Sequence, residues 1–208
     1  MSDHVVRLER LEAAKIADAQ AGFGIMDPGI HSIVPGVKAA GTAFTVKCYP
    51  GSIITVHRAL VRAKPGDVLV VDGEADGRAG ALMGELMARE AIDRGLRGIV
   101  CDGALRDAAG LRELGFPSFA RYVTPRVGVN RRLGLTEVNV TVGGVIVRMG
   151  DYILADDDGV AVIPREQIAE IIEKVEAINV KEQGFADAID RHERLVDILG
   201  FGELIGVK

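Results

Sequence analysis

The sequence predicts an α/β fold with a mixed β-sheet in a single domain. Three observations support this prediction. Helical and strand-like patterns alternate up to about residue 123, and hairpin patterns dominate residues 136–164. The 208-residue chain also shows no change in composition that would mark a linker. A purely parallel, doubly wound sheet is not expected, because hairpins pair strands antiparallel.

The first elements follow from apolar spacing and turn residues. Apolar residues at helical intervals predict a helix within residues 5–20, and a segment rich in glycine and proline at 21–36 predicts a loop. The β-rich segment at 41–48 predicts a strand. Ser52 is positioned to cap a helix over residues 53–63, which ends before a Lys-Pro-Gly-Asp turn.

The later elements follow in the same way, and two hairpins stand out. One surrounds Gly143 and Gly144, and the other surrounds the ADDDG segment at 155–159. The remaining predicted elements are a buried strand at 68–73, a helix at 82–94, a strand at 97–103, a helix at 108–114, a strand at 116–123, a helix at about 165–182 and a helical tail at 185–199.

Composition excludes several classes of protein. Aromatic residues make up only 4% of the chain, with no tryptophan, which argues against stacking of single-stranded bases. The net charge of −5 disfavours binding to a phosphate backbone. The N-terminus lacks the apolar region of a signal peptide, and no run of about 18 apolar residues suggests a membrane span. We therefore expect a cytoplasmic protein without a nucleic-acid or membrane partner.

Several possible chemical motifs have ordinary structural explanations. The glycine-rich segment DGEADGRAG at 72–80 lacks the Gly-Lys-Ser/Thr ending of a phosphate loop, so a plain loop is expected. The four histidines have no metal-ligand spacing, and His57 fits a surface or hydrogen-bonded histidine. Cys48 and Cys101 lie far apart in apolar runs, which predicts two buried, reduced thiols.

The most informative block is GELMAREAIDRGLRGIVCDGALRD at residues 84–107. Glu85 lies near the start of a predicted helix, where free N–H groups can receive a carboxylate. Arg106 can clamp a carboxylate, and Asp107 with a second acid nearby can hold a hard divalent cation. Local physics alone leaves another interpretation open, in which Arg106 and Asp107 form a surface ion pair and Glu85 compensates the helix dipole.

This block resembles the active-site signature of class II pyruvate aldolases in the RraA-like family: an acidic residue, twenty intervening residues, then Arg-Asp. Glu85 and Arg106 enclose twenty residues, and Asp107 follows. The resemblance extends over about residues 25–165 and includes KPGDVLVVDG and GDYILADDDGVAVIP. It implies a β/β/α swivelling-type sandwich as a single domain over residues 1–208, with this core and C-terminal helices at 165–200.

The resemblance also implies a role for each residue of the block. Asp107 would ligate Mg²⁺ or Mn²⁺, and Arg106 would bind the pyruvyl carboxylate or keto oxygen. Residues 84–87 would line the substrate, with backbone N–H groups of Leu86 and Met87 as donors beside Gly84. Glu85 would position a metal-bound water that shuttles protons. Active sites would lie in clefts between the subunits of homotrimers or homohexamers.

The function that this resemblance implies is a metal-dependent lyase that releases pyruvate. Its substrates would be 4-hydroxy-2-oxo acids, with diacids and triacids as the leading expectation, and oxaloacetate would be decarboxylated through the same enolate. The alternative is a non-catalytic RraA-type regulator that binds a protein such as ribonuclease E. Such regulators lack the complete acidic and Arg-Asp set. Two segments depart from the aldolase pattern, namely Ser52-Ile53-Ile54, where polar residues are common, and residues 185–208.

Overall fold

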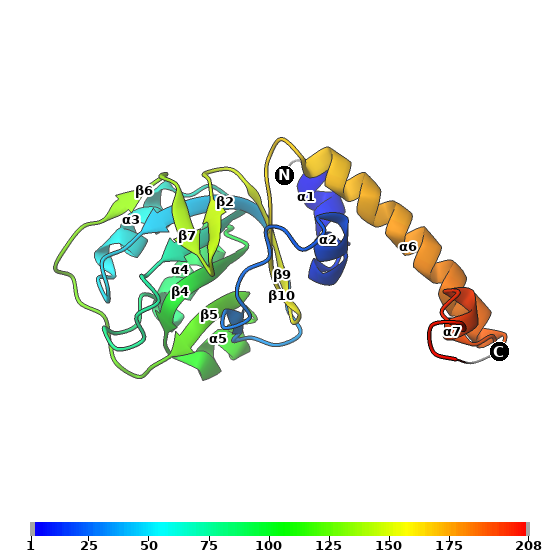
Figure 1. Cartoon of the computed structure of the whole chain (residues 1–208). Helices are drawn as coiled ribbons and strands as arrows, with labels where there is room; N and C mark the ends of the chain where they lie inside the picture. The colour runs from blue at the N-terminus through cyan, green and yellow to red at the C-terminus, as the bar shows by residue number, and fades with distance from the viewer. Residues whose placement is uncertain (1–2, 207–208) are drawn as a thin grey trace.

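The structure is a computed structural model that describes residues 3–206. A mixed sheet forms its centre, with strand order β1-β5-β4-β3-β2-β9-β10 and β6 beside β2 (Figure 1). The strands β2 to β5 pair in parallel, whereas β9 and β10 form an antiparallel hairpin beside β2. The predicted α/β class with a mixed sheet is therefore confirmed. The sheet strands are β1 (His31–Ser32), β2 (Ala39–Lys47), β3 (Asp67–Asp72), β4 (Gly98–Leu105), β5 (Ser118–Val123), β6 (Leu135–Thr136), β9 (Tyr152–Asp156) and β10 (Gly159–Ile163).

Different elements cover the two faces of the sheet. The helices α3 (Ile54–Arg62), α4 (Glu85–Asp93) and α5 (Ala108–Leu114) pack on one face, over side chains such as Leu69 and Val71. The hairpin of β7 (Val140–Val142) and β8 (Val145–Val147) packs on the other face, over Val68 and Val70. Alternate residues of β3 thus enter separate apolar clusters, as the period of a strand requires.

The central strands explain why their sequences are continuously apolar. Every residue of β3 and β4 is buried, because both faces of this parallel part of the sheet are covered. The two cysteines belong to the same interior, and both are buried and free, as expected. Burial raises the pKa of the Cys48 thiol to about 12 and raises the pKa of Cys101 well above its ordinary value.

The helices at the chain ends form a third layer beside β9 and β10. The first two, α1 (Asp3–Leu8) and α2 (Ala13–Ala19), pack against the start of α6 (Ile168–Asp190). The predicted single N-terminal helix is therefore two helices, separated by a turn at residues 9–12. Ion pairs of Arg7 with Glu176 and of Lys15 with Glu182 hold the middle of α6 to α1 and α2. Beyond Glu182, α6 extends away from the body and ends beside α7 (Leu195–Ile198), as Figure 1 shows.

We call residues 176–206 the C-terminal arm. Helix α6, which forms the first part of this arm, is longer than the helix predicted over residues 165–182, because it runs to Asp190. Ala188 is a buried residue of the arm, whereas many of its apolar side chains are exposed. The exposed ones are Val180, Ile189, Leu195, Leu199, Phe201, Leu204 and Ile205.

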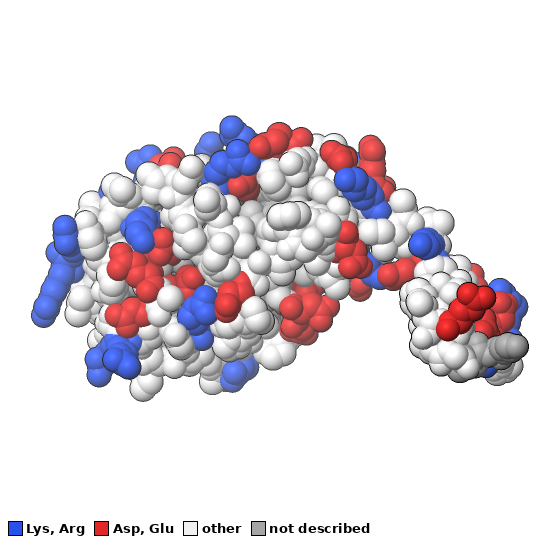
Figure 2. Space-filling view, in the orientation of Figure 1, with Lys and Arg blue, Asp and Glu red and all other residues white. Residues whose placement is uncertain are grey.

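Two surface properties bear on the expected partners. Over residues 3–206, no helix has the length and apolar character needed to cross a membrane. On the face seen in Figure 2, basic and acidic side chains lie interspersed rather than in one extended basic area.

Candidate active site

The residues singled out in the sequence meet at the carboxyl end of β4. There the strand leads through Arg106 and Asp107 into α5, and the N-terminus of α4 lies alongside. Ligand sites of open α/β sheets commonly occupy this edge of parallel strands. All six predicted site residues, at positions 84–87, 106 and 107, therefore lie in one neighbourhood.

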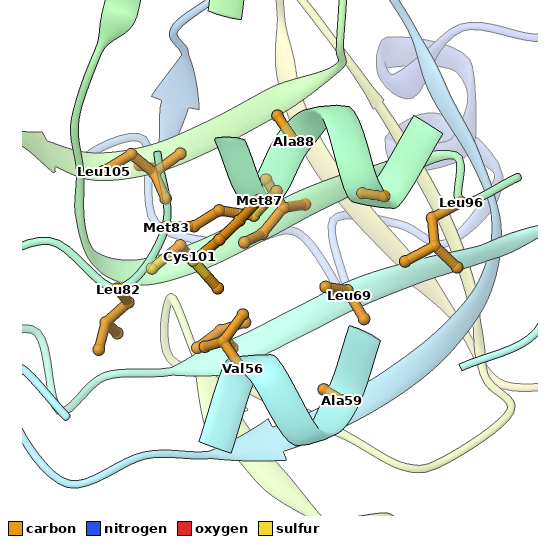
Figure 3. Close-up of a cluster of buried hydrophobic side chains, with 14 of the residues drawn as sticks. Val56, Ala59, Leu69, Leu82, Met83, Met87, Ala88, Leu96, Cys101 and Leu105 are labelled. Carbon is orange, nitrogen blue, oxygen red and sulfur yellow. The ribbon is translucent and has the colours of Figure 1, made fainter. Parts of the chain in front are cut away.

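Backbone hydrogen bonds hold the two segments together. The N–H of Leu82 donates to the carbonyl of Ala104 at 2.8 Å, and the N–H of Arg106 donates to the carbonyl of Met83 at 3.0 Å. This extended pairing explains why α4 begins at Glu85 and not at residue 82 as predicted. Figure 3 shows Met83 beside Met87 and Leu105 in the cluster beneath α4, so the site stands on a packed base.

Asp107 is held in an unusual conformation. Its φ of 58° is left-handed, which costs energy for a residue other than glycine and often marks a functional position. Although it precedes α5, its carboxylate does not cap that helix. Instead Oδ2 accepts hydrogen bonds from the Glu85 N–H at 3.2 Å and from Arg106 Nε at 3.1 Å. Oδ1 accepts no hydrogen bond from the described part of the chain.

Gly84 makes this close approach possible. A Cβ at this position would lie 2.5 Å from Asp107 Oδ2 and 2.9 Å from Arg106 Cγ. Any side chain would therefore displace the carboxylate or the guanidinium. The sequence alone did not single out this requirement, because Gly84 appeared there only as a substrate-lining residue within the helix predicted at 82–94.

Arg106 and the first turn of α4 supply donors for an anionic ligand. Arg106 Nε donates a hydrogen bond to Asp107, and the two terminal nitrogens of Arg106 make no hydrogen bond within residues 3–206. The N–H groups of Leu86 and Met87 lie in the first turn of α4, where an α-helix has no backbone acceptor for them. The side chain of Met87 is buried in the core, whereas Leu86 is 79% exposed.

Glu85 has one engaged oxygen and one open oxygen. Its Oε1 accepts hydrogen bonds from Arg89 Nε at 3.0 Å and Nη2 at 2.6 Å, one helical turn away. Its Oε2 accepts no hydrogen bond from the described residues and lies over Gly110, where a Cβ would approach to 2.3 Å. Sequence reasoning missed Arg89 and Gly110; the spacing of four residues between Glu85 and Arg89 was the available signal.

A pocket of about 190 Å³ opens at this cluster. Residues from distant parts of the chain join it, namely Ile53, His57 and Val127. The sequence did not point to His57 or Val127, whereas Ile53 belongs to the Ser52-Ile53-Ile54 segment that departs from the aldolase pattern. These residues lie at the pocket because the segment around residue 128 runs beside the start of α3. The Ile53 N–H donates to the Val129 carbonyl at 3.0 Å. The lining comprises Ile53, His57, Ala81, Met83, Gly84, Leu86, Met87, Arg106, Asp107 and Val127.

Asp107 is the residue that could hold a divalent cation here. Residues 3–206 contain no cluster of three or more histidine, cysteine or acidic side chains suited to a metal. A single carboxylate with an open oxygen still suits Mg²⁺ or Mn²⁺, which retain waters and complete their shell with substrate oxygens. The donor set therefore fits a hard, weakly held cation and not zinc, which prefers a closed set of nitrogen and sulfur ligands.

Comparison with known proteins gives the family. The model of the RraA-like family, described as Aldolase/RraA, matches residues 13–162. A candidate 4-hydroxy-4-methyl-2-oxoglutarate aldolase from Halalkalibacterium halodurans is 32% identical over 191 residues, which is 91% of this chain and 88% of that protein.

Solved structures agree with this result. An uncharacterized protein from Pseudomonas syringae superposes with a TM-score of 0.84 at 28% identity, covering 93% of this chain and 95% of that one. The RNA-processing inhibitor RraA from Thermus thermophilus superposes with a TM-score of 0.68 at 30% identity, covering 74% of this chain and 93% of that one. With its family model matched over most of its length and its fold shared with these structures, this chain belongs to the RraA-like family.

Proposed function

We propose that this protein is a divalent-metal-dependent lyase that releases pyruvate from 4-hydroxy-2-oxo acids and decarboxylates oxaloacetate at the same site. The observation that carries the proposal is the convergence of Arg106, Asp107 and the first turn of α4 on one pocket, with donors and one carboxylate oxygen still open. The candidate aldolase among its relatives supports the same class of reaction.

The chain's own residues account for binding of the pyruvyl end. The terminal nitrogens of Arg106 can form two parallel hydrogen bonds with the substrate carboxylate. The N–H groups of Leu86 and Met87 add donors and the positive end of the α4 dipole. A cation held by Asp107 supplies Lewis-acid polarisation of the 2-keto group when it is bound. Together these groups stabilise the negative charge that develops on the keto oxygen more strongly than they stabilise the neutral ground state.

The two reactions differ in the proton that must be moved. In retro-aldol cleavage, the C3–C4 bond breaks, its electrons form the pyruvate enolate, and the 4-hydroxyl loses a proton as C4 becomes a carbonyl. The open Oε2 of Glu85 can hold the water that accepts this proton. In oxaloacetate decarboxylation the same bond breaks and carbon dioxide leaves, so no hydroxyl proton is removed. Protonation of the enolate at C3 completes both reactions.

A regulator that acts by binding a protein is the second candidate, and the similarity to the RNA-processing inhibitor from Thermus thermophilus supports it. An enzyme is favoured here because Glu85, Arg106 and Asp107 are all present with open hydrogen-bonding capacity at a pocket. A pure binding protein would not require that combination.

The first prediction is that pyruvate release depends on a divalent cation. We expect the protein to release pyruvate from a 4-hydroxy-2-oxo acid and from oxaloacetate with Mg²⁺ or Mn²⁺, to lose both activities after exhaustive chelation, and to regain them when the cation is restored. A coupled lactate dehydrogenase assay measures pyruvate, with the free cation alone as the blank. Full activity after chelation would refute the metal requirement, and no release from any 2-oxo acid would favour the regulator.

We further propose that the protein forms homotrimers or homohexamers, which the uncovered apolar side chains of the C-terminal arm support. The second prediction is therefore a mass three or six times that of the 22.1 kDa chain, measured by light scattering at micromolar concentration. A mass near that of one chain would contradict it.

A further inference from the structure

The Glu85 carboxylate is held between α4, which carries it, and α5, which follows Asp107. Arg89, one turn further along α4, donates to Glu85 Oε1 from Nε at 3.0 Å and from Nη2 at 2.6 Å. On its other side the carboxylate lies against Gly110 of α5, where a Cβ would be 2.7 Å from Glu85 Cδ and 2.9 Å from Cγ. Arg89 thus engages one oxygen, and the glycine leaves room for the carboxylate beside α5.

Gly110 and Asp107 belong to one short segment. The N–H of Leu111 donates to the carbonyl of Asp107 at 2.9 Å in the first turn of α5, next to Gly110. The N–H of Glu85 in turn donates to Asp107 Oδ2 at 3.2 Å. The Glu85 carboxylate therefore lies against the segment that presents the Asp107 carboxylate. These contacts are made within one chain, and they require no residue of a neighbouring subunit.

Glycine at position 110 is unfavourable for the helix that contains it. A glycine inside a helix is less stable than an alanine, because it has more backbone freedom to lose on folding. Gly110 lies within α5, with helical residues on both sides. The space that its missing side chain leaves is filled by the Glu85 carboxylate, which gives a reason for the glycine.

A second ion pair with the same spacing lies at the other end of α4. There Arg94 Nε donates to Glu90 Oε1 at 2.9 Å. Exposed pairs separated by four residues contribute little to the stability of a protein. What distinguishes the pair of Arg89 with Glu85 is its place beside Asp107, where fixing a carboxylate has a consequence for the candidate site.

We propose that Arg89 and Gly110 are positioning residues for Glu85 in carbon–carbon cleavage. Arg89 engages Oε1 and Gly110 gives the carboxylate its place, so Oε2 is the oxygen that holds the water. The 4-hydroxyl proton passes to this water as the C3–C4 bond breaks and its electrons form the pyruvate enolate. The inference rests on the proposed function, which assigns this proton to Glu85. Decarboxylation of oxaloacetate removes no hydroxyl proton, so the ratio of cleavage to decarboxylation reports on Glu85.

The test measures, with Mg²⁺ present, the ratio of kcat for cleavage to kcat for decarboxylation of oxaloacetate. The cleavage substrate is 4-hydroxy-4-methyl-2-oxoglutarate or 4-hydroxy-2-oxopentanoate, whichever the wild type cleaves faster. Arg89→Met should lower the ratio at least about fivefold, and Arg89→Lys should restore part of it, because an ammonium group can still pair with Oε1. Gly110→Ala should lower the ratio at least about tenfold, because its Cβ displaces the carboxylate. Arg94→Met, the matched control, should change the ratio less than about twofold.

Two further measurements separate positioning from a structural role. Gly110→Ala should unfold at or above the wild-type temperature, because alanine favours the helix and the displaced group is the end of a flexible side chain. In a Glu85→Ala background, Arg89→Met and Gly110→Ala should each change the ratio less than about twofold, because both act through Glu85.

The outcomes separate this inference from the proposed function. An unchanged ratio in Arg89→Met or Gly110→Ala, whether both rates fall or neither does, would overturn the inference alone. A further fall of the ratio in the Glu85→Ala background would do the same. An unchanged ratio in Glu85→Ala itself, or decarboxylation without cleavage by the wild type, would overturn the inference and leave the decarboxylase intact. No pyruvate from any of these compounds, oxaloacetate included, would overturn the lyase and the inference with it.

Discussion

Asp107→Ala and Arg106→Ala should each abolish pyruvate release from both 4-hydroxy-2-oxo acids and oxaloacetate. Each removes a group that stabilises the enolate, which both reactions share. The loss of one donor to a developing oxyanion costs about 3–4 kcal/mol, so we expect kcat/KM to fall by a factor of roughly a few hundred to a thousand. Arg106→Lys should stay impaired, because an ammonium group cannot form two parallel hydrogen bonds with a carboxylate.

The same pyruvate assay tests these variants against controls from nearby surface. Asp93→Ala changes an acidic residue at the other end of α4. Arg62→Ala removes an exposed arginine at the end of α3 that pairs with Glu137. Both should keep near-wild-type kcat/KM, because neither lines the pocket. If Asp107→Ala released pyruvate from every 2-oxo acid at nearly the wild-type rate, the assignment of the site would be wrong.

The polar residues of the candidate site could be proposed together from the sequence, because they lie in one continuous block at positions 84–107. Glu85 lies near the start of a predicted helix, and Arg106 with Asp107 follows a buried strand, so parallel pairing of β3 and β4 brings both segments to one edge. These placements need only local patterns and the direction of the strands.

The apolar half could not be predicted in that way. Ile53 and Val127 reach the pocket through contacts between the start of α3 and the segment near residue 129, which are far apart in the sequence. Ser52 shows the same limit: its hydroxyl was expected to cap α3, but it donates to the Arg132 carbonyl at 2.7 Å. A tertiary partner 80 residues away thus takes a group that local rules assign to the helix.

The chain ends show a different limit. Helical spacing correctly indicates helices at both ends, but it does not set their lengths. The N-terminal pattern spans a turn at residues 9–12, while α6 continues through Gly184 to Asp190. Glycine weakens a helix by only about 1 kcal/mol, so a single one need not end it.

Gly84→Ala should reduce kcat/KM about a hundredfold while leaving the fold intact. Gly84 has a φ of −146°, which alanine adopts without strain, so the backbone should not change. The new Cβ would lie 2.5 Å from Asp107 Oδ2, and relief of that contact must move the carboxylate or the Arg106 side chain. A displacement of about 1 Å in a catalytic group can cost two orders of magnitude in rate. Pyruvate release and thermal unfolding should be measured on the same preparation.

Gly184→Ala is the matched control for this substitution. Gly184 lies in α6, is exposed, and would place its Cβ with no heavy atom within 4 Å. Alanine there should keep full activity and raise stability by roughly 0.5–1 kcal/mol, because it is the better helix former. A Gly84→Ala protein with unchanged kcat/KM would mean that Asp107 and Arg106 need not keep this spacing for catalysis. If Gly84→Ala lost its activity together with its thermal transition, Gly84 would serve the fold. If Gly84→Ala lost activity at an unchanged Tm, the glycine would serve the geometry of Asp107 and Arg106.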